Sequence, residues 1–450
     1  MVCIKKQPNR LFFGIIKIME YKFPDGFLWG SATSAHQVEG GNFNDWTEWE
    51  HANSERLAAE AARRHAKTHM RIPDYILERY PNPLQPENYI SGKACDHYNR
   101  YEQDFDIAKS LGQNAHRFSI EWSRIEPEEG KFSEAEIEHY RKVILALRQR
   151  GLEPFVTLWH WTNPTWFAKR SGWLNKDSPK YFERYVNKIT LSLEDVKVNF
   201  WITLNEPEVY VGASYFSGQW PPQKSSLISG IKVYQNLIKA HQLVYKKIHQ
   251  ISGNSLVGTA KNNSFYEPFS DYLLDRLVVR LNHYLRNEWF LNKIKNYQDF
   301  IGLNYYFHDR VKFSLTLKSP GGIFVRNKNK NESINNLGWE IYPEGIYRVL
   351  KDLKKYDKPI YITENGLADA NDEKRAKFIK EHLRWVHKVI QEGVDVRGYL
   401  YWSLLDNFEW DKGFWPRFGL VEVDYKTTER RIRSSAYEYA KICKNNALEI

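Results

Sequence analysis

Two short apolar runs in this sequence each end in a glutamate. FWITLNEP (200–207) carries Glu206 after a β-rich segment, and PIYITENG (359–366) carries Glu364 in the same setting. An ionised side chain at the edge of a core costs free energy unless it is paired, hydrogen-bonded or hydrated. A lone Asn-Glu-Pro is typical of an ordinary strand end. Two carboxylates brought together can instead hydrolyse a glycosidic bond, since one protonates the leaving oxygen while the other attacks the anomeric carbon or activates water.

The distance between the two carboxyl groups decides which of these routes is followed. A separation of about 5 to 5.5 Å makes the second carboxylate a nucleophile and retains the configuration of the sugar. A separation of about 6.5 to 9.5 Å leaves room for a water molecule and inverts the configuration. The sequence alone leaves this choice open, because it depends on the elements that bring Glu206 and Glu364 together.

Eight apolar runs rich in β-branched and aromatic residues recur along the chain, and amphipathic stretches such as 133–151 and 370–393 lie between them. The runs are 27–35, 114–122, 153–160, 200–207, 255–263, 299–306, 359–366 and 396–406. Alternating strands and helices predict parallel strands joined by crossovers. Eight such units over residues 20–445 predict the α/β class with a single (β/α)8 TIM barrel. A doubly wound dinucleotide-binding sheet would need G-x-G-x-x-G after the first strand, where the chain has GSATSAHQVEGG.

In such a barrel the carboxyl ends of all the strands meet at one mouth, where functional groups lie. Seven of the predicted strands end in polar or aromatic residues: Gln37 and Glu39, Arg117 and Glu121, His160 and Trp161, Asn205 and Glu206, Asn304 and Tyr306, Glu364 and Asn365, and Trp402 with Asp406, Glu409 and Trp410. Any one of these could be a cap or a satisfied core group. Seven strand ends together predict one ligand site.

Composition argues against several other classes of protein. The chain has 450 residues, 42% of them hydrophobic, and its net charge of +10 comes from 65 basic and 55 acidic residues that are spread throughout, so no basic stripe predicts a nucleic-acid partner. Three distant cysteines, Cys3, Cys95 and Cys443, favour a reducing, cytoplasmic location, and no metal or organic cofactor is expected. No apolar run is long enough to span a membrane, and residues 1–19 are predicted to be a disordered N-terminal extension.

These motifs together resemble glycoside hydrolase family 1, the family of retaining β-glucosidases and β-galactosidases. The resemblance runs from about Phe23 to Tyr439 and rests on FLWGSATSAHQVEG, HRFSIEWSRIEP, LNEP, FIGLNYY, YITENG and YWSLLDNFEW. It implies that Glu206 is the general acid/base and that Glu364 is the nucleophile, which forms a covalent glycosyl-enzyme.

The resemblance also assigns the residues around this pair. Arg117 would keep Glu364 ionised, Tyr306 would hydrogen-bond the same carboxylate, and Asn304 would support the pair. The residues implied in substrate binding are Gln37, His160, Trp161, Asn205, Trp402, Glu409, Trp410 and Phe418, with Trp339 in the aglycone site. Aromatic floors and polar walls suit sugars, which have an apolar face and many hydroxyl groups. Trp402 would lie beneath the sugar ring.

The implied function is the retaining hydrolysis of terminal, non-reducing β-D-glycosides. The resemblance favours a β-glucosidase with β-galactosidase and β-fucosidase side activity, acting on small β-glycosides or oligosaccharides. A catalytically silent or weak sugar-binding barrel and a transglycosylase with the same site are the alternatives. Intact Glu206 and Glu364 favour the enzyme over the silent barrel. No membrane partner is expected, and a homo-oligomer stays open.

The chain departs from the family pattern in three places. Thr162, Asn163 and Pro164 stand at the pocket rim, where the family has Asp-Leu-Pro or a close relative. A shortened segment between strands 5 and 6 predicts added mobility or an extra apolar crevice over residues 262–298. The loop after strand 1 is enlarged by residues 51–93, an Ala-rich helical half followed by a Pro-broken half. This insertion is predicted to narrow the aglycone entrance, with surface decoration as the alternative.

Overall fold

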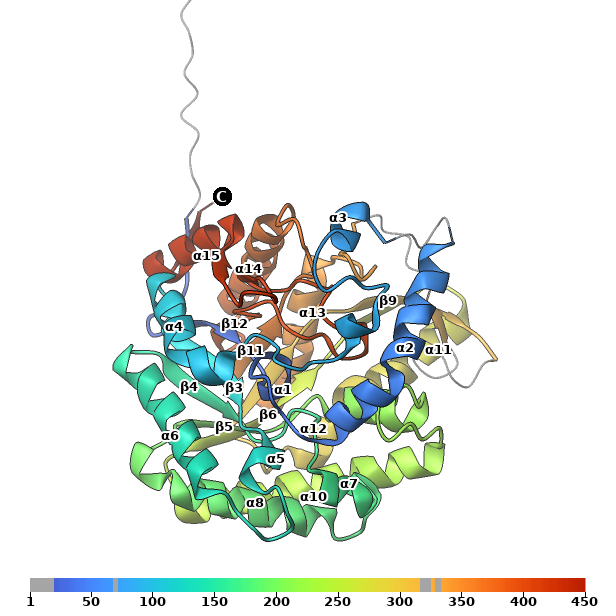
Figure 1. The fold of residues 1–450 in the computed structure, drawn as a ribbon. Coiled ribbons are helices and arrows are strands. Elements are labelled where there is room, and N and C mark those ends of the chain that lie inside the picture. The colour runs from blue at the N-terminus through green and yellow to red at the C-terminus, as the bar shows by residue number, and fades with distance from the viewer. Residues whose placement is uncertain (1–19, 68–71, 316–324, 328–332, 450) are drawn as a thin grey trace, which may run out of the picture.

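The computed structural model describes residues 20–67, 72–315, 325–327 and 333–449. Helices surround a central sheet, and the two ends of the described chain lie close together (Figure 1). The expected disordered extension, residues 1–19, lies outside the described residues. Among the helices of the described part, none is both long and apolar enough to cross a membrane.

Eight parallel strands close into a barrel in the order β11, β12, β2, β3, β4, β5, β6 and β8. Their bounds are β2 (Leu28–Ala32), β3 (Ala115–Ser119), β4 (Glu153–Thr157), β5 (Phe200–Asn205), β6 (Leu256–Asn262), β8 (Phe300–Asn304), β11 (Ile360–Asn365) and β12 (Val396–Trp402). The spatial order follows the chain, so each strand reaches its neighbour by a crossover. The predicted α/β class and (β/α)8 barrel are confirmed.

Apolar side chains from these strands fill the barrel below its mouth. The cluster comprises Ala115, Phe155, Phe200, Ile202, Ala260, Phe300, Tyr361 and Leu400. Phe155 and Phe200 stack with ring centroids 4.1 Å apart. The barrel is therefore a packed core rather than a pore, and a ligand approaches at the carboxyl ends of the strands.

The helices around the barrel bury their apolar faces against it. The amphipathic stretches at 133–151 and 370–393 form α6 (Glu134–Gln149) and α14 (Arg375–Gln391). Ser133 caps α6 by accepting the amide hydrogen of Glu136, which satisfies one free donor of the first turn. The other outer helices are α4 (His97–Ser110), α8 (Ser178–Ser192), α10 (Leu227–Ile251), α13 (Pro343–Leu353) and α15 (Ser434–Asn445).

Shorter elements connect these units. The short helices are α5 (Trp122–Ile125), α7 (Thr165–Lys169), α9 (Pro207–Val211), η3 (Gly172–Leu174), η4 (Glu194–Val196), the π-helix η5 (Gly212–Phe216), η7 (Lys354–Tyr356) and η8 (Trp410–Lys412). Apart from β7 (Phe265–Pro268), which lies between β6 and β8, the described strands outside the barrel are β1 (Glu20–Lys22), β9 (His308–Phe313), β10 (Val325–Asn327), β13 (Val421–Val423), β14 (Arg430–Ile432) and β15 (Ala447–Glu449). The antiparallel pair of β1 and β15 joins the two ends of the described chain.

The loop after β2 carries α1 (Ala35–Val38), which precedes the predicted insertion at residues 51–93. The insertion itself contains most of α2 (Asp45–His65), then α3 (Asp74–Leu77) and the 3-10 turn η2 (Pro86–Tyr89). Helix α2 begins ahead of residue 51, because Asn44 caps it and forms a reciprocal capping box with Thr47. The helix runs along the flank of the mouth, on the right in Figure 1. The insertion is thus continuous with the loop that carries the strand exit.

Between β6 and β8 the chain is mostly helical. This segment contains β7 (Phe265–Pro268), α11 (Leu273–Asn282), the π-helix η6 (His283–Glu288) and α12 (Trp289–Ile294). Residues 295–299 alone join α12 to β8, in line with the predicted short connection. Phe290 and Leu291 are buried in the core, whereas Leu273 and Leu277 of α11 are exposed. The inner face of the segment is packed, and its added mobility stays a prediction.

Candidate active site

Glu206 stands at the mouth of the barrel, directly after β5. Its backbone is left-handed, with a φ of 40°, a conformation that costs a non-glycine residue about 1–3 kcal/mol and persists only where the surroundings hold it. The Glu206 amide donates to the carbonyl oxygen of Ala260 in β6 at 2.8 Å, and Pro207 begins α9 immediately afterwards. This turn directs the glutamate side chain into the mouth instead of along the strand.

The Glu206 carboxyl group accepts two amide hydrogen bonds. Its Oε1 atom accepts from Asn304 Nδ2 at 2.8 Å and from Asn262 Nδ2 at 3.1 Å. Burial raises the pKa of Glu206 well above its ordinary value, and the negative charges of Glu364 and Glu208 raise it further. The amide donors only partly oppose this effect, so the group is suited to carry a proton near neutral pH.

Glu364, near the end of β11, has stronger hydrogen-bond donors around it. Arg117 Nη1 donates to Glu364 Oε1, and the Tyr306 hydroxyl group donates to Glu364 Oε2 at 2.8 Å. Burial raises the pKa of Glu364 above its ordinary value, and the Arg117 charge and the bond from Tyr306 oppose this rise. Both of these donors favour the ionised carboxylate, which is the form that a nucleophile requires.

Asn205 connects the surroundings of the two carboxylates. Its Oδ1 atom accepts from Arg117 Nη2 at 2.6 Å and from Asn304 Nδ2 at 3.2 Å. The same two side chains donate to Glu364 and to Glu206, respectively. In the register of the barrel, Asn304 of β8 lies beside Glu364 of β11. One hydrogen-bond network therefore orients both carboxylates toward the same space.

Gln37 and Glu409 form a polar wall of the mouth. Gln37 Nε2 donates to the carbonyl oxygen of Phe408 at 2.8 Å and to Glu409 Oε2 at 3.4 Å. Asn407 Nδ2 also donates to Glu409 Oε2, at 3.0 Å. Burial raises the pKa of Glu409 to about 8. Two buried polar side chains from the first and the last barrel units thus meet at one position.

His160 lies between two tryptophans. Its ring is close to parallel with Trp402 and Trp410, with centroid distances of 5.9 and 6.0 Å. Asn205 Nδ2 lies 3.1 Å from His160 Nε2, and Trp161 Nε1 donates to the carbonyl oxygen of Asn205 at 2.9 Å. Burial and the Arg117 charge lower the pKa of His160. The imidazole is therefore neutral, and its Nδ1 atom has no partner among the described residues.

Trp339 and Phe418 form an apolar side of the mouth. They pack in one cluster with Trp402 and Tyr306, and the Trp339 and Phe418 ring centroids are 6.1 Å apart. Phe418 and Trp402 are buried, whereas Trp339 is half-buried. The structure thus brings the sequence-predicted site residues to one mouth, with Trp339 at its more open edge.

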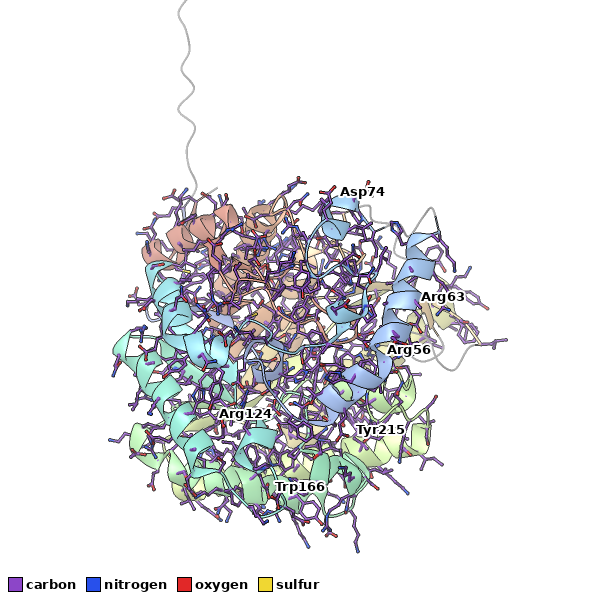
Figure 2. All side chains as sticks on the ribbon, in the orientation of Figure 1. Arg56, Arg63, Asp74, Arg124, Trp166 and Tyr215 are labelled. Atoms are coloured by element: carbon purple, nitrogen blue, oxygen red, sulfur yellow. The ribbon has the colours of Figure 1, made fainter. Side chains whose placement is uncertain are left out.

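Other polar residues expected at the strand exits hold loops in place. Arg124 Nε, labelled in Figure 2, donates to Glu39 Oε2 at 3.0 Å. Arg433 Nη1 donates to Asp406 Oδ1 at 2.8 Å, and the positive charges around Asp406 lower its pKa to about 2 despite its burial. The Glu39 and Asp406 carboxylates pair with these arginines and not with the Glu206 network, so they support the loops of the mouth.

The unusual residues after His160 and Trp161 lie beneath the rim. Thr162 Oγ1 donates to Glu121 Oε2 at 2.8 Å, and Asn163 Nδ2 donates to Asp45 Oδ2 at 2.8 Å. Asp45 is the first residue of α2, and burial raises its pKa to about 7. The departure from the family pattern therefore connects the β4 exit to the first turn of the insertion.

The insertion also reaches the loop that carries Trp339. Asn336 Nδ2 donates to the Tyr75 hydroxyl oxygen at 3.0 Å, and Asn336 is three positions before Trp339. Figure 2 labels Arg56 on α2 and Asp74 on α3, which mark the course of the insertion along the rim. The α3 region thus contacts the Trp339 loop.

Asn262 is a site residue that sequence reasoning missed. The sequence prediction uses the ends of seven strands and omits β6, although the end of β6 reads Ala-Lys-Asn-Asn. Asn262 donates to Glu206, and Thr363 Oγ1 donates to Asn304 Oδ1 at 2.6 Å. The pair of asparagines at the strand end was a usable signal, whereas Thr363 lies inside β11 and its sequence context gives no such signal.

Within the described ranges, no group of three or more His, Cys, Asp or Glu side chains could hold a metal ion.

Comparison with known proteins agrees with this architecture. The model of glycosyl hydrolase family 1 matches residues 19–296 and 291–448. β-Glucosidase A of Thermotoga maritima is 35% identical over 95% of this chain and 99% of its own. The structure of a β-glycosidase from Pyrococcus horikoshii is 42% identical, with a TM-score of 0.82 and 96% of each chain covered. A Thermotoga maritima β-glucosidase structure in complex with glucoimidazole is 32% identical, with a TM-score of 0.81, covering 95% of this chain and 99% of that one.

A parallel barrel with two buried carboxylates at its mouth, together with these relatives, defines a glycoside hydrolase. The chain belongs to glycosyl hydrolase family 1.

Proposed function

We propose that the protein is a retaining β-glucosidase, which hydrolyses terminal, non-reducing β-D-glucosides through a covalent glycosyl-enzyme. The observation that carries this proposal is the contrast between the two buried carboxylates. Arg117 and Tyr306 donate to Glu364, whereas the side chains that donate to Glu206 within the described part of the chain are amides. The relative named β-glucosidase A and the related structure with glucoimidazole favour glucose as the sugar.

In the first step, Glu364 attacks the anomeric carbon while Glu206 transfers its proton to the leaving oxygen. The bond between the anomeric carbon and that oxygen breaks, the aglycone leaves as an alcohol, and an ester joins the sugar to Glu364. The raised pKa of Glu206 lets it carry the proton, and the donors on Glu364 favour the ionised nucleophile against the effect of its burial.

In the second step, Glu206 acts as a base. Glycosylation neutralises Glu364 and thereby removes one of the negative charges that raise the pKa of Glu206. Glu206 can then take a proton from a water molecule, which attacks the anomeric carbon and releases the sugar with its original configuration. A sugar hydroxyl group in place of water would give transglycosylation by the same site.

The polar wall is proposed to hold the sugar. Gln37 and Glu409 would bind hydroxyl groups at the far end of the sugar, and His160 would use its unpartnered Nδ1 atom. Trp402 would lie beneath the ring. The other proposed binding residues are Asn205, Trp161, Trp410 and Phe418.

β-Galactosidase and β-fucosidase side activities are proposed as well. Glucose and galactose differ at carbon 4, and an amide beside a carboxylate can donate to or accept from a hydroxyl group in either orientation. Gln37 and Glu409 offer such a pair, 3.4 Å apart. Nitrophenyl glucoside, galactoside, fucoside and mannoside compared side by side would rank these sugars. A galactoside rate below one hundredth of the glucoside rate would remove the side activity from the proposal.

The insertion is proposed to narrow the aglycone entrance. Its Tyr75 bonds to Asn336 on the loop that carries Trp339, and a neutral hydrogen bond contributes about 0.5–1.5 kcal/mol. Tyr75→Phe is expected to raise KM for cellobiose by about two- to tenfold and to leave KM for methyl β-glucoside within about twofold. If the variant and the wild type have the same KM for cellobiose and the same KM for methyl β-glucoside, the insertion is surface decoration only.

The proposal is tested by the configuration of the first product. Proton NMR during hydrolysis of phenyl β-glucoside should show β-glucose before mutarotation produces the α-anomer. α-Glucose as the first product would mean an inverting enzyme and would overturn the role given to Glu364. A sugar-binding barrel without catalysis would release neither anomer, and a transglycosylase would release oligosaccharides in place of free glucose at low substrate concentration.

A further inference from the structure

A buried ion pair lies directly behind the proposed acid/base. Lys261 Nζ of β6 is 2.9 Å from Glu208 Oε1 of α9, and the two side chains are 1% and 7% exposed. The cost of burying two charges is seldom repaid in stability alone, because an apolar pair of similar size is often as stable. Stability alone therefore does not explain why this pair lies beside Glu206.

The Lys261 ammonium group contacts two other elements as well as its own strand. It forms the ion pair with Glu208 of α9, and it donates to the carbonyl oxygen of the next residue, Asn262, at 2.8 Å and to the carbonyl oxygen of Arg286 in the π-helix η6 at 2.5 Å. One cation thus ties the loop after β5, the end of β6 and the helical segment that precedes β8.

Two of these three contacts lie on residues that determine where Glu206 is. Glu208 is two positions after Glu206 in the chain, and Asn262 donates its side-chain amide to Glu206 Oε1. The left-handed backbone of Glu206 is strained and must be held by its surroundings. Lys261 holds the chain after Glu206 and the strand that carries its hydrogen-bond donor.

We propose that Lys261 is a positioning residue for the acid/base, which fixes Glu206 against the leaving oxygen by gripping Glu208 and Asn262 together. This inference rests on the proposed function of Glu206. Lys261 does not contact the substrate space itself, because its ammonium group is buried among Glu208 and two backbone carbonyl groups. Its effect is therefore expected in the proton-transfer step alone.

Charges from several elements act on Glu206. Glu364 of β11 and Glu208 of α9 raise its pKa, and the amides of Asn304 and Asn262 lower it. Lys261 pairs with Glu208, and Arg286 also acts on Glu208. Removal of the Glu208 charge alone should lower the pKa of Glu206, which shortens the pH range in which the acid is protonated.

The test compares substrates that do and do not need an acid. Dinitrophenyl β-glucoside has a leaving group that departs without protonation, whereas phenyl β-glucoside needs the proton from Glu206. Lys261→Met is expected to lower kcat/KM for phenyl β-glucoside by about 10- to 100-fold, a part of the 10²–10⁴ that general acid catalysis supplies. The loss for dinitrophenyl β-glucoside is expected to be at least about tenfold smaller.

Two further variants separate position from charge. Glu208→Gln keeps a hydrogen-bond acceptor for Lys261, so it should preserve the ratio of kcat/KM between the two substrates. Because it removes the Glu208 charge, it should move the basic limb of the pH profile to lower pH. Lys261→Met/Glu208→Leu removes both charges of the pair, so it should fold even if the single variant does not, and it should show the same substrate-dependent loss as Lys261→Met.

A control is Arg124→Met, which removes a partly buried ion pair with Glu39 elsewhere at the barrel mouth. Arg124→Met should lower kcat/KM for both substrates by the same factor. An equal loss of kcat/KM for both substrates in Lys261→Met, or in the double variant, would overturn the positioning role and leave only a structural one. Failure of the wild type to turn over either glucoside, or inversion of the product, would instead overturn the proposed function.

Discussion

The ends of β5 and β11 carry the same residue type in the same buried mouth, yet their surroundings differ. Glu364 is bonded by a guanidinium group and a phenol, both of which stabilise the anion. Glu206 is bonded by two neutral amides and faces the charges of Glu364 and Glu208. The difference teaches that the proposed division of roles between the two glutamates comes from their neighbours, since burial raises the pKa of both.

The largest expected effect comes from removal of the nucleophile. Glu364→Ala should lower kcat for dinitrophenyl β-glucoside by about 10⁴-fold or more, because no covalent intermediate can form. Azide added to this variant should take the place of the lost carboxylate and yield the α-glycosyl azide. Glu373→Ala, an exposed glutamate in the following loop, is the control. Undiminished turnover by Glu364→Ala would contradict the role of nucleophile that distinguishes Glu364 from Glu206.

Removal of the acid should have a smaller and more selective effect. Glu206→Ala is expected to lower kcat/KM for phenyl β-glucoside by about 10²–10⁴-fold and for dinitrophenyl β-glucoside far less. Here azide should attack the glycosyl-enzyme and give the β-glycosyl azide, the opposite anomer to that from Glu364→Ala. The same anomer from both variants would show that the two roles had been assigned wrongly.

Tyr306→Phe sharpens the comparison on the nucleophile side. Loss of a hydrogen bond to a charged group costs about 1.5–3 kcal/mol, so kcat/KM should fall by about 10- to 150-fold. The bond from Tyr306 lowers the pKa of Glu364. Its loss should raise that pKa and move the acidic limb of the pH profile to higher pH. Tyr284→Phe, on the exposed side of η6, should leave the limb in place.

The smallest expected effect is on the acid side. Asn262→Ala removes a neutral amide donor from Glu206, which is worth about 1 kcal/mol, so kcat/KM for phenyl β-glucoside should fall by about fivefold. The bond from Asn262 lowers the pKa of Glu206, so its loss should raise that pKa and move the basic limb to higher pH. A shift of the acidic limb instead would mean that Asn262 acts on Glu364 and not on Glu206.

The sequence was sufficient for the barrel and for most of its mouth. Strand and helix periods are local properties, and parallel strands bring their ends together whatever the loops do. Arg117 and Tyr306, for example, were placed beside Glu364 by family resemblance, and both contact it. The predicted helix at 133–151 is α6, with its cap at Ser133.

Other features of the site could not be predicted, because they depend on how distant segments meet. Glu206 has a left-handed backbone and donates its amide hydrogen to Ala260 of β6, a contact that its own sequence does not reveal. The ion pair of Lys261 and Glu208 joins residues that are far apart in the chain. The start of α2 ahead of residue 51 depends on the cap at Asn44, which lies outside the predicted insertion.

The antiparallel pairing of β1 with β15 has a consequence for engineering. Glu20 and Glu449 are direct partners in that pair, so a linker of a few residues could join the two ends of the barrel into a closed chain. New ends could then be opened in the exposed turn at Gly253, on the face opposite the mouth. The barrel is thus a natural scaffold for circular permutation, with the catalytic strands left in their original order around the ring.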